Sequence, residues 1–134
     1  MTAPETSIIV RAFNEAKHLP ALLEALKTQT YRDFEVILVD SGSIDGSREI
    51  AEDYGCRVIR ISSHDFTFGY SLNVGIEAAR GKFMAIASAH TVPEKPDWLS
   101  NLVAPLKGDK VAMVYGRQLG VESSKFGEVE DFRR

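Results

Sequence analysis

The sequence predicts an α/β domain in which a mainly parallel central sheet is covered by helices on both faces. Short apolar runs alternate along the chain with segments whose apolar residues recur at helical spacing, a rhythm typical of strand–helix–strand units. Most of the apolar runs are rich in β-branched residues and lack polar alternation, which indicates strands buried on both faces. The 134 residues are enough for one such domain.

Five apolar runs are expected to form strands. Four of them are short and almost wholly apolar, as strands inside a parallel sheet are. Arg57–Ile61 alternates polar and apolar residues and is therefore expected nearer an edge, whereas Phe83–Ala87 is expected to be central. In chain order the expected strands are Ser7–Val10, Glu35–Asp40, Arg57–Ile61, Phe83–Ala87 and Val111–Tyr115.

Four helices are expected between these strands. The leucines of Leu19–Leu26 fall at the spacing of one helical face. Asp45 is placed to cap the second helix. The third helix is expected to bury Leu72, Ile76 and Ala79. The first helix is expected over Leu19–Leu26, and the second, after Asp45, is expected to carry Ile50, Ala51 and Tyr54 and to stop at Gly55. The third is expected from about Tyr70 to Arg80, and the fourth is expected to hold Trp98, Leu99, Leu102 and Val103.

Composition excludes several classes of function. Sixteen basic against nineteen acidic residues give a formal charge of −3, which argues against a nucleic-acid groove or an anionic-membrane patch. The single cysteine, Cys56, excludes an internal disulfide and a cysteine-cluster metal site, and it is expected to be a small buried hydrophobe. The sequence has neither a secretion-signal pattern nor a transmembrane-length apolar run, so a soluble cytoplasmic protein is expected.

Polar clusters follow three of the expected strands. They are Arg11–Glu15, Asp40–Ser43 and Ser88–His90. Ligands of open α/β sheets bind beyond the carboxyl ends of the strands, near the point where strand order reverses. The three loops are therefore expected to meet at one crevice.

Each cluster also has a purely structural explanation. Asn14 and Glu15 could cap a helix, and Asp40–Gly46 could be a tight turn whose side chains satisfy backbone donors. His90 could be a partly buried histidine bonded to a carbonyl. Taken together the clusters favour function, because unrelated caps have no reason to gather at one edge of a sheet.

Three segments carry a resemblance to a known family. Ser7–Asn14 (SIIVRAFN), Asp40–Gly46 (DSGSIDG) and Asn73–Gly81 (NVGIEAARG) resemble the N-terminal half of family-2 glycosyltransferases, in order and spacing, over about residues 6–116. The resemblance implies a Rossmann-like GT-A fold, a nucleotide-diphosphate-sugar donor and inverting transfer to a hydroxyl acceptor. It also implies a role in bacterial polysaccharide or glycoconjugate synthesis.

The resemblance further implies a nucleotide-binding set. In the family, the carboxylate at the position of Asp40 hydrogen-bonds the nucleoside base or ribose, as an ionised acceptor can. Phe13 stands where the family usually has Tyr, and Ser41 stands where it has a second Asp. The implied set is Arg11, Phe13, Asn14, Glu15, Asp40, Ser41, Gly42 and Asn73.

The metal motif of the family is altered in this chain. Ser88-Ala89-His90 stands where the family has Asp-x-Asp, and it resembles the Asp-x-His variant of other GT-A enzymes. A divalent cation, Mn²⁺ or Mg²⁺, is expected to neutralise the leaving diphosphate, with His90 and Ser88 as ligands. Metal-dependent transfer is favoured over metal-independent transfer.

The acceptor half of the family is not recognised in this sequence. Residues 1–116 are expected to form the nucleotide-sugar-binding core, and residues 117–134 an irregular tail or the start of a truncated acceptor region. Glu128, Glu130 and Asp131 do not match the family's catalytic base and are more typical of a solvated charge run. A non-catalytic nucleotide-sugar-binding module is the alternative. A sugar nucleotidyltransferase is disfavoured, because Arg11–Glu15 contains no glycine.

Overall fold

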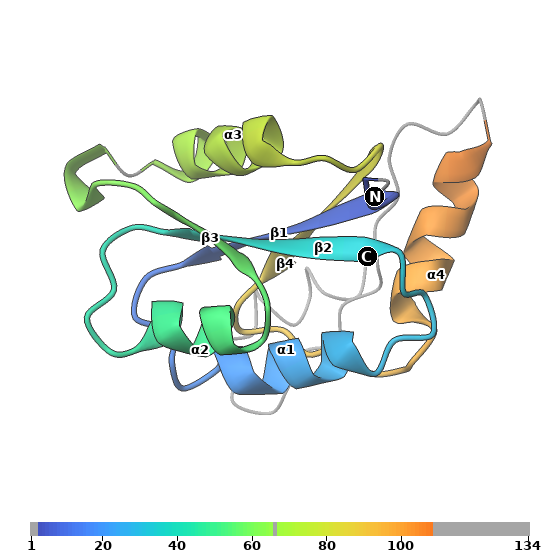
Figure 1. Ribbon diagram of the computed structural model, residues 1–134, viewed down its shortest axis with the longest axis horizontal. Coiled ribbons are helices and arrows are strands. Elements are labelled where there is room, and N and C mark those ends of the chain that lie inside the picture. The colour runs from blue at the N-terminus through green and yellow to red at the C-terminus, as the bar shows by residue number, and fades with distance from the viewer. Residues whose placement is uncertain (1–2, 66, 109–134) are drawn as a thin grey trace, which may run out of the picture. The chain divides into compact units, whose positions relative to one another are not determined.

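The computed structural model describes residues 3–65 and 67–108. The chain divides into two compact units, residues 1–100 and 101–134, and the sheet belongs to the first. Among the described residues, no helix has both the length and the apolar composition to cross a bilayer. The elements are β1 (Thr6–Ala12), α1 (Leu19–Lys27), β2 (Phe34–Asp40), α2 (Ser47–Asp53), β3 (Arg57–Arg60), a 3₁₀ turn (Ser63–Asp65), α3 (Phe68–Ala78), β4 (Phe83–Ser88), α4 (Trp98–Val103) and a second 3₁₀ turn (Ala104–Lys107) (Figure 1).

The four described strands form one parallel sheet in the order β3-β2-β1-β4. The predicted parallel sheet and the edge position of β3 are confirmed. Among the four described strands β4 stands at the end of the order, and the central position predicted for it stays a prediction. The strand predicted at 111–115 and the tail at 117–134 lie outside the described residues.

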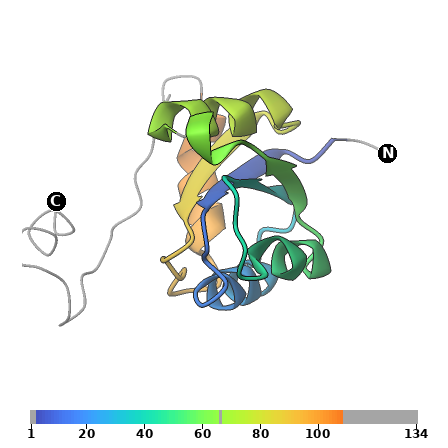
Figure 2. The ribbon, with the colours of Figure 1, turned by 90° about the vertical axis from the view of Figure 1, so that its left-hand side faces the viewer.

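Helices cover both faces of the sheet, as predicted. In Figures 1 and 2, α1 and α2 lie on one face and α3 lies on the other. Parallel strands are joined by right-handed crossovers, so helices change face when the strand order reverses. The order reverses after β3, because the chain next forms β4 on the far side of β1. The switch point of the sheet therefore lies between β1 and β4.

Alternate residues of the central strands supply the two layers of the core. Ile9, Ile37 and Val39 are buried and pack with side chains of α3, while Ile8 and Val10 alternate with them along β1. The helical face predicted for α1 is confirmed. Its four fully or almost fully buried side chains are Leu19, Leu22, Leu23 and Leu26.

α3 begins two residues earlier than predicted and presents a different face to the sheet. Thr67 precedes it, and its hydroxyl oxygen accepts from the Tyr70 N–H at 3.0 Å, which caps the first turn. Ile76, predicted to be buried, is 37% exposed. Gly75 is buried in its place, because a Cβ there would lie 2.6 Å from Ile9 Cγ2. The missing side chain brings the helix close to the strands.

The second glycine of this segment also permits a close approach. A Cβ on Gly81 would lie 2.6 Å from the backbone nitrogen of Ser7, and the Gly81 N–H donates to Ser7 Oγ at 2.9 Å. Gly75 thus lets α3 approach β1 and β2, and Gly81 lets the connection between α3 and β4 approach β1. The glycines of the NVGIEAARG segment therefore have structural roles.

Glu35 joins four segments at the amino end of the sheet. Its carboxylate accepts from Ser7 Oγ (2.6 Å), Arg57 Nη1 (2.9 Å) and the Arg80 N–H (2.8 Å). Burial raises the pKa of Glu35, but these hydrogen bonds and the Arg57 charge outweigh burial and lower it below the ordinary value. The carboxylate is therefore ionised in the native state at neutral pH.

Replacing Gly75→Ala is expected to lower the free energy of unfolding by about 1–3 kcal/mol, because the new methyl group overpacks Ile9 and Val39. Gly69→Ala in the same helix is the control, since a Cβ there meets nothing within 4 Å. Alanine at that position should stabilise α3 by up to about 1 kcal/mol. Urea unfolding measures both, and a Gly75→Ala protein as stable as the wild type would contradict the close packing.

Replacing Glu35→Gln is expected to cost about 2 kcal/mol at pH 7, the usual value of hydrogen bonds to a charged group. The pKa of Glu35 is lower in the native state than its ordinary value of 4.5, so the ionised carboxylate stabilises the folded protein above pH 4.5. This contribution is lost as the pH falls through the native pKa of Glu35. The difference between Glu35→Gln and wild type should therefore shrink below pH 4.5. Glu77→Gln, on the exposed side of α3, is the control in the same series of thermal melts.

Candidate functional site

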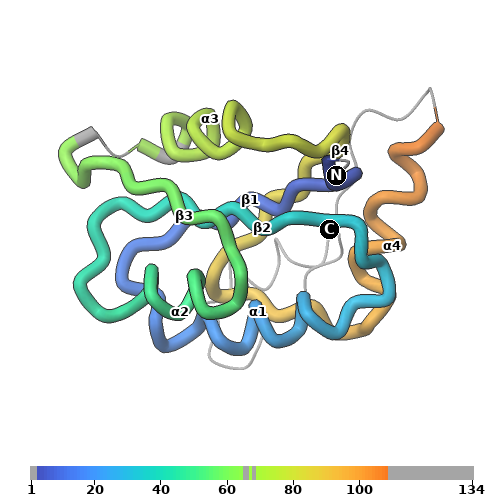
Figure 3. The backbone as a smooth tube through the Cα atoms, in the orientation of Figure 1, coloured from blue at the N-terminus to red at the C-terminus, as the bar shows by residue number. Residues whose placement is uncertain are grey.

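The loops that follow β1 and β2 lie side by side at the carboxyl end of the sheet (Figure 3). Side chains of one loop bind backbone groups of the other, so the two loops form a single unit. Four hydrogen bonds among the described residues join them: Asn14 N–H to Ser43 Oγ (2.8 Å), Glu15 N–H to Ser47 Oγ (2.8 Å), Ala16 N–H to Asp45 Oδ2 (3.0 Å) and Ile44 N–H to Asn14 Oδ1 (2.8 Å).

Asp45 contributes to this unit at the start of α2. It does not occupy the N-cap position predicted for it, which is held by Gly46. Its Oδ1 nevertheless accepts from the Ser47 N–H at 3.1 Å and from the Ser47 hydroxyl at 2.6 Å. The Ser47 hydrogen bond, with the backbone N–H groups of Ala16 and Ser47, lowers the pKa of Asp45. The carboxylate is therefore a stable acceptor for both loops at neutral pH.

Asp40 is completely buried at the end of β2. Its Oδ2 accepts from the Gly42 N–H (3.2 Å) and the Ser43 N–H (3.0 Å), and its Oδ1 accepts from the Ser43 hydroxyl. Arg48 Nε lies 3.8 Å from Oδ2. The turn considered as the structural explanation of this segment is therefore formed, and Asp40 holds its shape.

The neighbours of Asp40 are divided between interior and surface. Ser41 is buried, and its hydroxyl donates to the Ala12 carbonyl at 3.4 Å. Gly42 has φ +107°, a conformation that side chains rarely adopt, and a Cβ there would come within 4.0 Å of the Phe13 ring. Phe13 is 52% exposed, so its ring is available at the surface beside this turn.

Two members of the predicted nucleotide-binding set lie apart from these loops. Arg11 is in β1, aligned with Val39 and Ser88, and burial lowers its pKa. Asn73 is exposed on α3, the helix on the opposite face from α1 (Figure 2).

His90 lies beside Glu15, across the switch point of the sheet. His90 Nε2 is 3.0 Å from Glu15 Oε1, with the imidazole 59% exposed and the carboxylate 15% exposed. The ring of His18 meets the ring of His90 edge to face, with centroids 4.6 Å apart. Candidate ligand atoms of Glu15, His18 and His90 all lie within 4.8 Å of one another.

Sequence reasoning missed His18. It belongs to no part of the family pattern and stands immediately before α1. Its spacing of three residues from Glu15 was the available signal, because residues three apart share one side of a helical turn. The Leu19 N–H does donate to the Glu15 carbonyl at 2.9 Å, which forms that turn.

Ser88 shapes the turn that carries His90. Its hydroxyl oxygen accepts from the His90 N–H at 3.3 Å, and its carbonyl accepts from the Thr91 hydroxyl at 2.7 Å. Carboxylate and imidazole are ligand types for divalent transition metals, so Glu15, His18 and His90 fit a cation chemically. A neutral hydroxyl such as that of Ser88 is a weaker metal ligand than a carboxylate or an imidazole.

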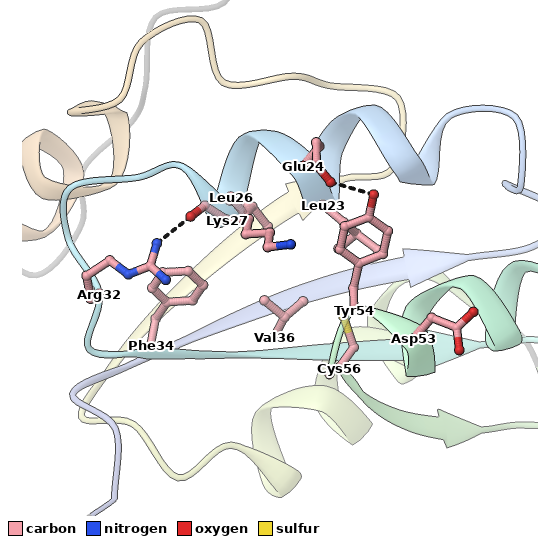
Figure 4. Close-up of a pocket in the computed structure, with 11 residues that line it drawn as sticks. Leu23, Glu24, Leu26, Lys27, Arg32, Phe34, Val36, Asp53, Tyr54 and Cys56 are labelled. Atoms are coloured by element: carbon pink, nitrogen blue, oxygen red, sulfur yellow. Dashed lines mark hydrogen bonds between the residues drawn. The ribbon is translucent and has the colours of Figure 1, made fainter.

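A separate open pocket of about 670 Å³ lies near the amino ends of β2 and β3, between α1 and β2 (Figure 4). Tyr54 and Glu24 meet at its rim, where the Tyr54 hydroxyl donates to Glu24 Oε2 at 2.6 Å. Burial raises the pKa of the Cys56 thiol to about 11, so the thiol is protonated at neutral pH. The pocket lies at the opposite end of the sheet from the polar loops.

Comparison with known proteins shows the family. The model of the family described as glycosyl transferase family 2 matches residues 7–131. The chain belongs to this family. Glycosyltransferase AglE of Haloferax volcanii is 33% identical over 121 residues, and the match covers 86% of this chain and 40% of AglE. A PGL/p-HBAD biosynthesis glycosyltransferase of Mycobacterium tuberculosis is also 33% identical over 121 residues, with 87% of this chain and 47% of that protein covered.

Solved structures confirm the predicted GT-A fold of this family-2 chain. A mannosyltransferase of Pyrobaculum calidifontis, in complex with GDP-Man and Mn²⁺, matches with a TM-score of 0.72 and 24% identity over 83% of this chain and 34% of its own. TarS of S. aureus, in complex with UDP-GlcNAc, matches with a TM-score of 0.67 and 25% identity over 77% of this chain and 31% of its own. The chain thus spans less than half the length of these relatives.

Replacing Asp40→Asn is expected to lower the free energy of unfolding by about 1.5–3 kcal/mol, because the buried carboxylate binds charged and backbone donors of its own loop. Asp53→Asn, at the exposed end of α2, is the control. Urea unfolding and titration with UDP are run on both variants. Unchanged stability together with lost UDP affinity would contradict the structural role and assign Asp40 to the nucleoside.

Proposed function

We propose that this chain is the donor-binding part of a family-2 glycosyltransferase, which takes a sugar from a nucleotide-diphosphate sugar and transfers it, with inversion, to a hydroxyl acceptor. The observation that carries the proposal is the meeting of Glu15 and His90 at the switch point, beside the joined loops after β1 and β2. The relatives complexed with GDP-Man and UDP-GlcNAc support a donor of this class.

The joined loops are proposed to receive the nucleoside. Their hydrogen bonds hold residues 13–16 and 40–47 in one conformation, so little ordering is needed when a ligand binds. Phe13 offers a ring at the surface, beside the turn that Gly42 forms with φ +107°. In this proposal Asp40 and Ser43 act chiefly by shaping the loop. Direct contacts from Arg11, Asn14, Ser41 and Asn73 stay predictions.

The diphosphate is proposed to lie against a divalent cation near His90. Such a cation supplies positive charge that stabilises the leaving diphosphate. Ser88-Ala89-His90 would offer one imidazole where the motif that it resembles offers two carboxylates. Among the described residues, Glu15 is the proposed anionic ligand. Glu15 and His90 are already in contact, and their donor types fit a cation.

Transfer also needs a group that takes the proton of the acceptor hydroxyl, and a site that binds the acceptor. A catalytic base must stand within hydrogen-bond reach of the acceptor hydroxyl, and the described residues offer no candidate that the family pattern identifies. The acceptor, the oligomeric state, a cytoplasmic location and a role in bacterial polysaccharide or glycoconjugate synthesis stay predictions.

Replacing His90→Ala is expected to abolish the Mn²⁺-dependent increase in affinity for the donor, a loss of about tenfold or 1.4 kcal/mol, while metal-free binding is retained. Calorimetry with UDP, dTDP and GDP sugars, with and without Mn²⁺, measures this. His64→Ala is the matched control, because His64 is exposed and lies outside the cluster.

Two outcomes would change the proposal. Absence of binding to every nucleotide sugar tested would reject it. Binding without loss of sugar in a turnover assay that includes simple hydroxyl acceptors would favour the non-catalytic binding module instead.

A further inference from the structure

We infer that His18 is a cation ligand, and that Glu15, His18 and His90 form one site of two imidazoles and one carboxylate that binds Mn²⁺ and similar transition-metal ions in preference to Mg²⁺. The inference deepens the proposed function and rests on it for the ligand that fills the remaining coordination positions. The site itself is built only from the three side chains.

The geometry of the cluster is close to that of a metal site. Two ligand atoms bound at about 2.0–2.1 Å to one ion lie about 3.0–3.4 Å apart, depending on coordination geometry. Glu15 Oε1 and His90 Nε2 are already 3.0 Å apart. A candidate nitrogen of His18 lies within 4.8 Å of both. The His18 imidazole makes no capping hydrogen bond to α1, so capping does not hold it away from an ion bound by the other two.

An ion pair alone does not account for the arrangement. A plain ion pair explains why His90 lies on Glu15, but it needs no third group. The His18 side chain makes no capping hydrogen bond to α1, although His18 occupies the N-cap position. Its ring instead stands against the ring of His90. Two imidazoles beside one carboxylate are the arrangement that a shared cation would stabilise.

The backbone holds the three side chains from two places in the chain, the turn that leads into α1 and the turn after β4. Glu15 is fixed through its N–H, which donates to Ser47 Oγ, and through its carbonyl, which accepts from the Leu19 N–H. His18 begins α1, and His90 is held by the turn at Ser88. The ligands are therefore brought together before any ion binds, which lowers the cost of binding.

The donor set determines which ion is preferred. Mg²⁺ favours oxygen ligands in near-ideal octahedral geometry and loses its waters reluctantly. First-row transition metals accept imidazole more readily than Mg²⁺ does, and Mn²⁺, although it binds nitrogen least strongly of that series, also accepts mixed nitrogen and oxygen ligands. Two of the three donors here are nitrogens. Three protein ligands also leave coordination positions open, and diphosphate oxygens of the proposed donor would complete them.

The experiment titrates the whole chain with Mn²⁺ alone and with Mg²⁺ alone. Calorimetry gives the two affinities, and the electron paramagnetic resonance signal of free Mn²⁺, subtracted from the total added, gives the amount of bound ion. Wild type should bind one Mn²⁺ at least ten times more tightly than Mg²⁺. His18→Ala should lose at least about tenfold in Mn²⁺ affinity, since even indirect partners of metal ligands are worth about 10–100-fold.

His64→Ala is the matched control. It removes the one histidine of the chain that is not in the cluster, so it should leave Mn²⁺ affinity unchanged. Circular dichroism and a thermal melt check that each variant is folded, and His18→Gln replaces His18→Ala if the alanine variant melts early. Mn²⁺ affinity equal to wild type in a folded His18 variant would overturn the inference. Equal affinities of wild type for Mg²⁺ and Mn²⁺ would overturn the metal preference.

A titration with nucleotide sugar in the presence of a chelator separates this inference from the proposed function. Metal binding that depends on His18, without any binding of nucleotide sugar, would leave the cation site standing and reject the donor site. Binding of nucleotide sugar without any binding of Mn²⁺ would do the reverse.

Discussion

Parallel pairing of β1 with β2 on one side and with β4 on the other determines where the chemistry of this chain can lie. The registers place Ala12 opposite Asp40 and Arg11 opposite Ser88, so all three strands end at the same level. The loops that follow them must then begin at one edge of the sheet. Glu15 and His90, far apart in the chain, meet there because the strand order reverses at β1.

The two ends of the sheet carry different tasks. At the amino end, Glu35 joins β1, β3 and the connection between α3 and β4, and its hydrogen bonds serve stability. At the carboxyl end, the polar groups are divided between a buried set that shapes the loops and an exposed set that faces outward. Asp40 and Ser41 belong to the first set and His90 to the second, and the exposed apolar ring of Phe13 lies at the same end of the sheet. This division is typical of a site that is rigid before its ligand arrives.

The proposed cation site differs in charge from the Asp-x-Asp motif that the Ser88-Ala89-His90 segment resembles. Replacing carboxylates by imidazole lowers the negative charge offered by the protein and raises the share of nitrogen donors. Such a site attracts a cation less strongly by charge alone and depends more on the identity of the metal. A diphosphate, which brings its own negative charge, would complement it.

Local pattern alone was enough to predict the architecture and the family. Apolar runs and leucines at helical spacing indicated the strands and α1, because side-chain periodicity follows directly from backbone geometry. The order of three short segments indicated family 2. Those segments also pointed to the loops of the candidate site, since the ends of parallel strands share one edge.

Tertiary structure decided how individual side chains are used. Asp40 is turned inward by donors from its own loop, and Ile76 is exposed because Gly75 takes the position against Ile9. His18 joins Glu15 and His90 only when α1 and β4 are in place. These outcomes depend on contacts between residues distant in the chain, and such contacts leave no trace in local periodicity. The sequence therefore determined which elements form and in what order, while packing between them determined which polar groups build the loops and which face a ligand.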